Sequence, residues 1–309
     1  LPPLPPSPAL AFRNSVVAIF SSHLTPILQS STANMLARLA LFAGLCALLA
    51  APAIAIEETD VLNFALNLEY LEANFYKCAR DGTPLDDSDT GGGKKPLGCK
   101  KAKNLDWQSR YLLNQIAEDE INHVKFLRAA LGDKAVKQPL IDIGPAFAAA
   151  ANAVANTTLS PAFSPYTNAL YFLHGAFIFE DVGVTAYHGG LRALTTDAYR
   201  QAAEGIMAVE AYHAGAVRLA LQNAGNKDTG YGIKVRPFVA AIAKTRDAID
   251  CKKFTKQDAG LEDLAPADKN GIAFLRNTDG VLKIVYLGGT TKGGFFPEGV
   301  NGVINKACA

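Results

Sequence analysis

The chain has 309 residues, of which 49% are hydrophobic and 19% are charged, and its formal net charge at pH 7 is +1. This composition is ordinary for a globular protein that buries a full core in one or two domains. No part of the chain resembles the basic patch of a nucleic-acid-binding protein, so that class is excluded.

The first 55 residues are predicted to be a targeting segment. Within them, residues 35–55 have a basic start at Arg38, continue as an apolar run and end with small residues at Ala53 and Ala55. This is the layout of a signal peptide with an A-x-A cleavage site. We therefore expect an exported protein with no membrane association after cleavage.

The compartment depends on how residues 1–34 are interpreted. They are rich in Ser and Pro and contain no acidic residue, which is typical of a plastid transit segment and would direct the protein to the thylakoid lumen. If translation instead starts at Met35, the protein is expected to be secreted to the extracellular space. A membrane anchor over residues 39–56 is the other interpretation, which Pro52 disfavours.

Four cysteines remain after the predicted cleavage. They are Cys78, Cys99, Cys251 and Cys308. An even number of cysteines in an exported chain suggests two disulfides, although the sequence does not determine the pairing. Joining Cys78 to Cys99 would close a Gly- and Lys-rich loop, and joining Cys251 to Cys308 would close the tail. Four unpaired thiols are the alternative.

Apolar residues spaced three and four apart predict four long helices. The expected ranges are about 58–81, 105–131, 165–190 and 197–223. Thr59 or Asp60 would cap the first helix, and Ser164 with Pro165 would start the third.

The connections between these helices predict the fold class. A polar loop joins the first pair, a long connection over about residues 133–164 leads to the third helix, and a short one joins the last pair. This wiring predicts an all-α, ferritin-like four-helix bundle with one long crossover, over residues 56–226. Residues 227–309 are expected to add a helix and a mostly irregular Gly-rich extension packed on the bundle. Trp107, at the start of the second helix, is interpreted as a packing residue.

Two segments of the chain repeat each other. "IAEDEINHVKFLRAAL" (residues 116–131) and "IMAVEAYHAGAVRLAL" (residues 206–221) share Ile, Glu, His, Arg, Ala and Leu at identical offsets. Each contains Glu-x-x-His, which places a carboxylate and an imidazole on one helix face. One such motif is weak evidence for a site, but two at matching points of a repeat are much stronger.

The repeat extends to the partner helices. Glu69 is followed seven residues later by Tyr76, and Glu180 is followed seven residues later by Tyr187. The spacing from Glu69 to the first Glu-x-x-His is 21 residues longer than the spacing from Glu180 to the second, which matches the polar loop around residues 83–103. The chain therefore reads as a duplicated helical hairpin with an insertion in the first copy.

Together the two hairpins supply the ligand set of carboxylate-bridged di-iron and di-manganese proteins. The predicted metal ligands are Glu69, Glu120, His123, Glu180, Glu210 and His213. Four buried carboxylates would be costly without cations, and two divalent ions balance their charge. Carboxylate with imidazole fits two iron ions or manganese better than magnesium or calcium. The alternative is that these residues lie on solvated helix faces and match only through common ancestry. The apolar sequence around Glu180 disfavours it, because an unpartnered carboxylate there would be costly.

Three further residues accompany this set. Glu72 lies one turn from Glu69 and is a ligand, an extra carboxylate or a gate for metal entry. Tyr76 and Tyr187 are candidate catalytic residues that relay electrons or form hydrogen bonds, although packing is the more common role of a tyrosine inside a helix. His174 and His188 are interpreted as packing or hydrogen-bonded residues.

Several stretches resemble one known family. "LNLEYLEANFY", "FLHGAF", "LKIVYLGG" and "GGFFPEGVNG" are similar to the desiccation-related ferritin-like proteins of plants, algae, fungi and bacteria, over about residues 59–305. The resemblance implies a ferritin-like bundle and an association with dehydration or oxidative stress, but no settled activity. Plant members often replace the third-helix Glu and the fourth-helix His, whereas this sequence carries Glu180 and His213.

The predicted function is a di-iron protein that binds Fe(II) and reacts it with dioxygen or peroxide, an oxidoreductase of the ferroxidase or peroxidase kind. His123 and His213 would each bind one metal. A non-enzymatic, stress-protective structural protein and a di-manganese, catalase-like enzyme are the alternatives. A ferritin-style storage cage is disfavoured by the loop and tail, and the sequence does not determine the oligomeric state.

Overall fold

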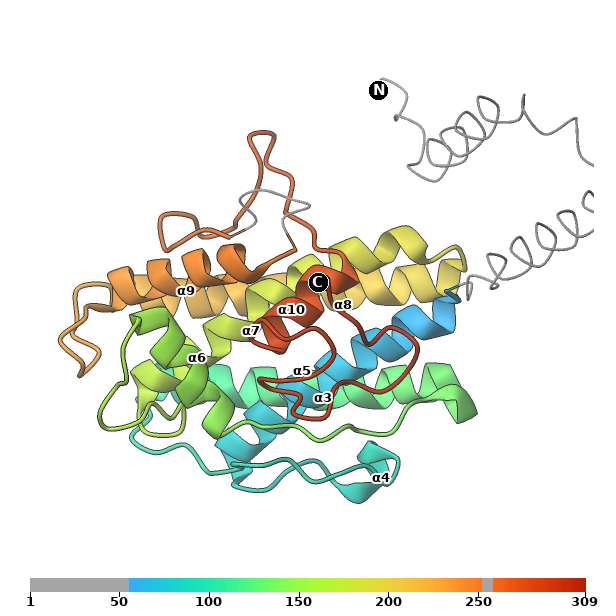
Figure 1. Cartoon of the computed structure of the whole chain (residues 1–309), viewed down its shortest axis with the longest axis horizontal. Helices are drawn as coiled ribbons and strands as arrows, with labels where there is room; N and C mark the ends of the chain where they lie inside the picture. The colour runs from blue at the N-terminus through green and yellow to red at the C-terminus, as the bar shows by residue number, and fades with distance from the viewer. Residues whose placement is uncertain (1–55, 252–257) are drawn as a thin grey trace, which may run out of the picture. The chain divides into compact units, whose positions relative to one another are not determined.

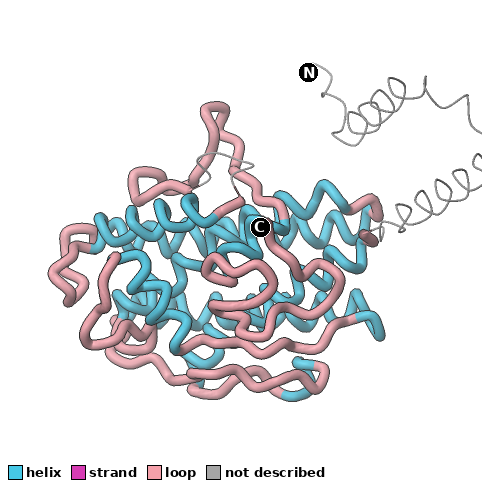
Figure 2. The backbone as a smooth tube through the Cα atoms, viewed as in Figure 1, coloured by secondary structure: helices cyan, strands magenta, loops and turns pink. Residues whose placement is uncertain are grey.

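The structure is a computed structural model, and it describes residues 56–251 and 258–309. The predicted targeting segment, residues 1–55, lies outside the described residues. Within the described ranges the chain forms helices and loops, with isolated β-bridges and no strand (Figure 2). None of the described helices combines the length and apolar character that crossing a membrane requires.

Four long helices form the bundle (Figure 1). They are α3 (Glu58–Asp81), α5 (Trp107–Leu131), α7 (Ala169–Gly190) and α8 (Asp197–Asn223). Helix α3 packs mainly against α5, and α7 mainly against α8, so each repeat is one hairpin. The predicted all-α bundle with one long crossover is confirmed.

Two helix starts differ from the sequence-based expectation. Glu57, rather than Thr59 or Asp60, is the N-cap of α3, and Asp60 completes a reciprocal capping box with it. Helix α7 begins after Asn168, whose side chain accepts a hydrogen bond from the Tyr171 amide. The residues after Ser164 form a turn instead, because the Tyr166 carbonyl accepts from the Lys103 amide of the neighbouring loop.

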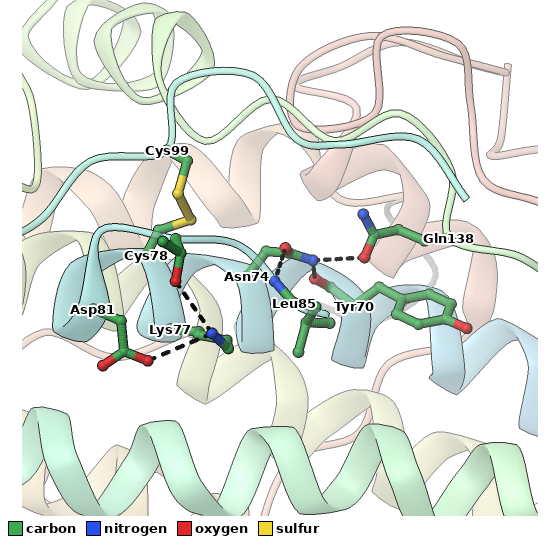
Figure 3. Close-up of a disulfide and its surroundings, with 9 residues drawn as sticks. Tyr70, Asn74, Lys77, Cys78, Asp81, Leu85, Cys99 and Gln138 are labelled. Atoms are coloured by element: carbon green, nitrogen blue, oxygen red, sulfur yellow. Dashed lines mark hydrogen bonds and ion pairs between the residues drawn. A yellow bond between two sulfur atoms is a disulfide. The ribbon is translucent and has the colours of Figure 1, made fainter. Parts of the chain in front are cut away.

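The loop and the crossover contain short helices of their own. These are α4 (Asp87–Thr90) in the loop, and η1 (Gly132–Lys134) and α6 (Pro145–Ala155) in the crossover; a further short helix, η2 (Leu191–Ala193), lies between α7 and α8. The disulfide between Cys78 and Cys99 ties the inserted loop to the end of α3 (Figure 3). Beside it the Asn74 side chain donates to Gln138 of the crossover and accepts from the Leu85 amide of the loop (Figure 3). Both connections are thereby attached to the same face of α3.

The C-terminal region contributes two helices, α9 (Val235–Ile249) and α10 (Thr278–Val285). Helix α10 was not expected, since this Gly-rich region was predicted to be a mostly irregular extension. It forms because Asn277 caps its first turn by accepting from the Gly280 amide. The second disulfide joins Cys251 to Cys308 and closes the tail.

A buried ionic network fastens the tail to α7. Asp181 accepts hydrogen bonds from Arg218 of α8 at 2.8 and 2.7 Å and from Arg246 of α9 at 2.9 Å. In the tail, the Arg276 side chain donates to the Thr185 hydroxyl at 2.9 Å and pairs with Asp258. The ion pairs and hydrogen bonds offset the hydration that these buried charges lose. Together they hold the C-terminal region against α7, the helix that carries Glu180.

Trp107 does not pack in the core, which corrects the expectation. Its side chain is 79% exposed and stacks on Tyr111, also at the surface. Trp107 is the first residue of α5, directly after the N-cap Asp106. His174 and His188 do form hydrogen bonds, with the carbonyls of Leu170 and Phe274.

Candidate metal centre

Six of the predicted ligands meet inside the bundle, one or two from each long helix. They are Glu69 on α3, Glu120 and His123 on α5, Glu180 on α7, and Glu210 and His213 on α8. All six are buried. Each is brought there by helix periodicity, because residues three apart on α5 and on α8 project from the same face.

The six residues form two overlapping groups, and in each group the candidate ligand atoms all lie within 4.8 Å of one another. We call the first group position one: it comprises Glu69, Glu120, His123 and Glu210. We call the second group position two: it comprises Glu120, Glu180, Glu210 and His213. Glu120 and Glu210 belong to both positions, whereas each remaining Glu and His belongs to one.

Both histidines direct Nδ1 into the centre. Nδ1 of His123 lies 3.3 Å from Glu69 Oε2 and 3.4 Å from Glu120 Oε2. Nδ1 of His213 lies 3.1 Å from Glu120 Oε1 and 3.5 Å from Glu180 Oε2. The two oxygens of Glu120 therefore face opposite histidines, which is the orientation of a bridging carboxylate.

Each tyrosine contacts the carboxylate of the other repeat. The Tyr76 hydroxyl donates to Glu180 Oε1, and the Tyr187 hydroxyl donates to Glu69 Oε1. Both tyrosines are buried. Each hydroxyl thus engages one oxygen of a non-shared glutamate, and a catalytic role of the two tyrosines stays a prediction.

Eight atoms of the six side chains are buried and form no regular hydrogen bond among the described residues, although the two Nδ1 atoms lie 3.1–3.7 Å from carboxylate oxygens. They are Glu69 Oε2, Glu180 Oε2, both oxygens of Glu120, both oxygens of Glu210, and Nδ1 of His123 and of His213. Buried polar atoms are normally satisfied, so eight converging exceptions call for a bound partner. Oxygen and imidazole nitrogen fit iron or manganese. The number of carboxylate oxygens without a hydrogen bond follows the grouping. Each glutamate of a single position has one such oxygen, and each glutamate of both positions has two.

The electrostatics of the metal-free centre are those of buried acids that share protons with the histidines. Burial raises the pKa of Glu69 to about 7, against the attraction of His123 and with repulsion from Glu120. Burial also raises the pKa of Glu210, with Glu120 adding to the effect. For His123, burial opposes the charged form, but Glu69 and Glu120 outweigh it and raise its pKa to about 11. Cations would relieve this repulsion.

Gly183 makes room for a shared carboxylate. A Cβ atom at this position would lie 2.3 Å from Glu210 Oε2, so any larger residue would force the Glu210 carboxylate to move. In the repeat, Gly183 stands three residues after Glu180, as Glu72 stands three residues after Glu69. The two copies therefore differ at this point.

Glu72 lies beside the centre but belongs to neither position. Its side chain is buried and lines a small cavity between α3 and α7, together with Gly183 and Phe295 of the tail. Burial raises its pKa, and the neighbouring Glu120 and Glu180 raise it further. Its predicted roles, as a ligand, an extra carboxylate or a gate for metal entry, stay predictions.

Asp119 is a contact of the centre that sequence reasoning missed. Its Oδ2 lies 3.0 Å from Nε2 of His213, across the gap from α5 to α8. The repeat offered no indication of it, because the equivalent residue before Glu210 is Val209. Only the adjacent acidic run "EDE" ahead of His123 could have drawn attention to the position.

Comparison with known proteins points to one family. The Ferritin-like domain profile matches residues 57–223. The chain is 30% identical over 241 residues to "Desiccation-related protein PCC13-62" of Craterostigma plantagineum, covering 73% of this chain and 76% of that protein. It is 26% identical over 267 residues to "Ferritin-like catalase Nec2" of Nesocodon mauritianus, covering 81% of this chain and 85% of that protein.

Proposed function

Since this chain belongs to the desiccation-related ferritin-like family, we propose that its bundle holds two iron ions, binds them as Fe(II), and reacts them with dioxygen or peroxide. The observation that carries the proposal is the set of eight buried ligand atoms without hydrogen-bond partners. Ordinary core packing does not leave so many polar atoms unsatisfied at one point.

The protein residues would have distinct tasks in this chemistry. Glu120 and Glu210 would hold both metals, while Glu69 with His123 and Glu180 with His213 would each hold one. Tyr76 and Tyr187 keep one oxygen of each non-shared carboxylate engaged, which orients the other oxygen inward. Two bound Fe(II) ions would supply the electrons for reducing dioxygen or peroxide. Burial of the centre would exclude bulk water from it.

A di-manganese, catalase-like function is the second candidate. It is favoured by the similarity to a protein named as a ferritin-like catalase, which this chain matches over 85% of that protein's length. The same carboxylate and imidazole ligands suit manganese. Metal identity therefore separates the two candidates.

A structural role is the remaining candidate. A bound metal pair would stabilise the bundle by mass action whether or not it reacts. An enzyme turns over, whereas a structural site shows at most one stoichiometric reaction. Repeated Fe(II) oxidation, or repeated peroxide decay, is thus the deciding readout.

The first experiment is elemental analysis of the isolated protein beside the double variant Glu180→Ala, Glu210→Ala. About two iron or manganese ions per chain, absent in the variant, would support the centre and name its metal. Oxygen-electrode assays with excess Fe(II), and peroxide decay with manganese-loaded protein, then separate the reactions. No metal in either protein after anaerobic loading with Fe(II) and with Mn(II) would refute the di-metal proposal.

Export is proposed from the two disulfides together with the signal-like residues 35–55. Disulfides are typical of oxidising compartments, and the structure pairs all four cysteines of the described chain. Secretion and the thylakoid lumen both remain candidate destinations. Mass spectrometry of the mature N-terminus, with fractionation of cells, would distinguish them; a start within residues 1–34 on a cytosolic protein would contradict export.

A further inference from the structure

The two proposed metal positions have different surroundings, although the internal repeat relates their ligands. Position one contains His123 and position two contains His213, both with Nδ1 directed inward. The difference lies at the outer nitrogen of each ring. This nitrogen matters because the partner of one imidazole nitrogen determines how well the other binds a metal.

At position two, the outer nitrogen has a carboxylate partner. Nε2 of His213 lies 3.0 Å from Asp119 Oδ2. The His213 side chain is 7% exposed, whereas that of Asp119 is 47% exposed. Asp119 therefore reaches from the bundle surface to a nearly buried ring, and it comes from a different helix than the histidine it contacts.

At position one, no such partner is present among the described residues. All the described ion pairs of His123 involve Nδ1, the inward nitrogen. The repeat explains this, because the residue equivalent to Asp119 in the second copy is Val209. A valine side chain offers no acceptor. The two histidines therefore differ in their outer partner because the repeat has Asp119 in one copy and Val209 in the other.

The contact has a defined chemical consequence. A carboxylate that accepts a hydrogen bond from Nε2–H selects the imidazole tautomer whose Nδ1 lone pair is free for a metal. It also fixes the ring plane and makes Nδ1 a better donor. Loss of such an outer partner commonly lowers metal affinity about 10- to 100-fold.

We propose that Asp119 is a positioning residue that holds His213 for metal binding and makes position two the tighter of the two metal positions. This inference rests on the proposed di-metal function. The first divalent ion then enters position two, and position one fills at higher metal concentration.

Two variants, each with one position disabled, allow the metal affinity of the other position to be measured. We call these variants the single-position proteins. Glu69→Gln removes a ligand only from position one, and Glu180→Gln removes one only from position two. Mn(II) binding to each, measured by titration calorimetry and by the EPR signal of bound Mn(II), gives the affinity of the position that remains. We expect Glu69→Gln to bind one Mn(II) about 10- to 100-fold more tightly than Glu180→Gln does.

Asp119→Ala is then added to both proteins. It should lower Mn(II) affinity about 10- to 100-fold in the Glu69→Gln protein and leave the Glu180→Gln protein unchanged. Glu118→Gln, a neighbouring acid on α5 with an exposed carboxylate, is the matched charge control and should change neither. Conversely, Val209→Asp should raise the affinity of position one in the Glu180→Gln protein. Far-UV circular dichroism verifies folding of every variant.

The outcomes separate the inference from the function on which it rests. Equal affinities of the two single-position proteins, or an equal loss in both on Asp119→Ala, would overturn the inference and leave the di-metal function standing. If Glu72→Gln rather than Asp119→Ala abolished the difference, the extra carboxylate would be its cause and the inference would be wrong. No Mn(II) or Fe(II) binding by the unaltered protein would refute the function itself.

Discussion

The hydroxyl of Tyr76, in the first repeat, donates a hydrogen bond to Glu180 in the second. In the same way, the hydroxyl of Tyr187, in the second repeat, donates a hydrogen bond to Glu69 in the first. Each half of the duplicated bundle therefore hydrogen-bonds a candidate ligand of the other. The exchange engages one oxygen per carboxylate and leaves the second oxygen facing the centre without a hydrogen bond. The two hydrogen bonds therefore link the first hairpin to the second.

Replacing either tyrosine by phenylalanine should destabilise the metal-free protein. The substitution leaves a buried carboxylate oxygen unpaired, which costs about 1–3 kcal/mol in the free energy of unfolding. Urea unfolding of Tyr76→Phe and Tyr187→Phe, without metal, measures the loss. Tyr111→Phe is the control, because Tyr111 is 54% exposed and should give no change. Equal unfolding energies for all three variants would contradict the proposed energetic role.

Shared and non-shared glutamates should differ in their effect on metal content. Glu69→Gln or Glu180→Gln affects one position, so about one metal per chain should remain. Glu120→Gln or Glu210→Gln weakens both positions at once, so the content should fall below about one. Elemental analysis after dialysis against a fixed metal concentration provides the measurement. The same residual content in all four variants would show that the glutamates are not divided in this way.

Gly183→Ala tests the close approach of Glu210. The added methyl group would lie 2.3 Å from Glu210 Oε2, so the carboxylate has to move and metal affinity should fall about 10-fold or more. Gly215→Ala on α8 is the matched control. Nothing lies within 4 Å of its added Cβ, and alanine in a helix should stabilise by about 0.5–1 kcal/mol. Unchanged metal affinity in Gly183→Ala would mean that Glu210 has room to adjust.

The stability of the metal-free protein should fall as pH rises. Burial raises the pKa of Glu69 from 4.5 to about 7, and the adjacent carboxylates raise that of His123 from 6.5 to about 11. In both cases the folded state keeps its proton to a higher pH than the unfolded state does. The stabilisation is complete below the unfolded pKa and is lost as pH rises through the folded one.

The pH windows are therefore 4.5 to about 7 for Glu69 and 6.5 to about 11 for His123. Metal binding has to displace these protons, so stabilisation by metal should increase over the same range. Unfolding curves with and without Mn(II), at about pH 5, 7 and 9, give both trends. A metal-free protein that becomes more stable between pH 5 and 9 would overturn the assignment of these protons.

The tail disulfide should contribute more stability than the loop disulfide. Cys251 and Cys308 are 57 residues apart, whereas Cys78 and Cys99 are 21 apart. In the chain-entropy model the longer loop is worth about 1 kcal/mol more, within a usual range of about 2–4 kcal/mol. Denaturant unfolding of the two Cys→Ser double variants compares them. Metal content should stay unchanged in the tail variant, because none of the six candidate ligands lies in the tail.

Much of the centre was accessible from the sequence alone. The duplicated Glu-x-x-His and the Glu preceding it on each hairpin predicted the candidate ligands and the helices that carry them, because helix periodicity converts spacing into a common face. The four helices and the crossover followed from the same local pattern. Residue-specific roles within the pattern did not follow, as the tyrosines show.

Other features required the tertiary structure. Three contacts join residues that are far apart in the chain: Tyr76 with Glu180, Asp119 with His213, and Asp181 with Arg246 of α9. No local periodicity encodes such contacts, since they depend on how helices from different parts of the sequence approach one another. The sequence therefore determined which candidate ligands the bundle offers. Only packing decided which glutamates both positions share, which carboxylate oxygens a tyrosine engages and which histidine has an outer carboxylate.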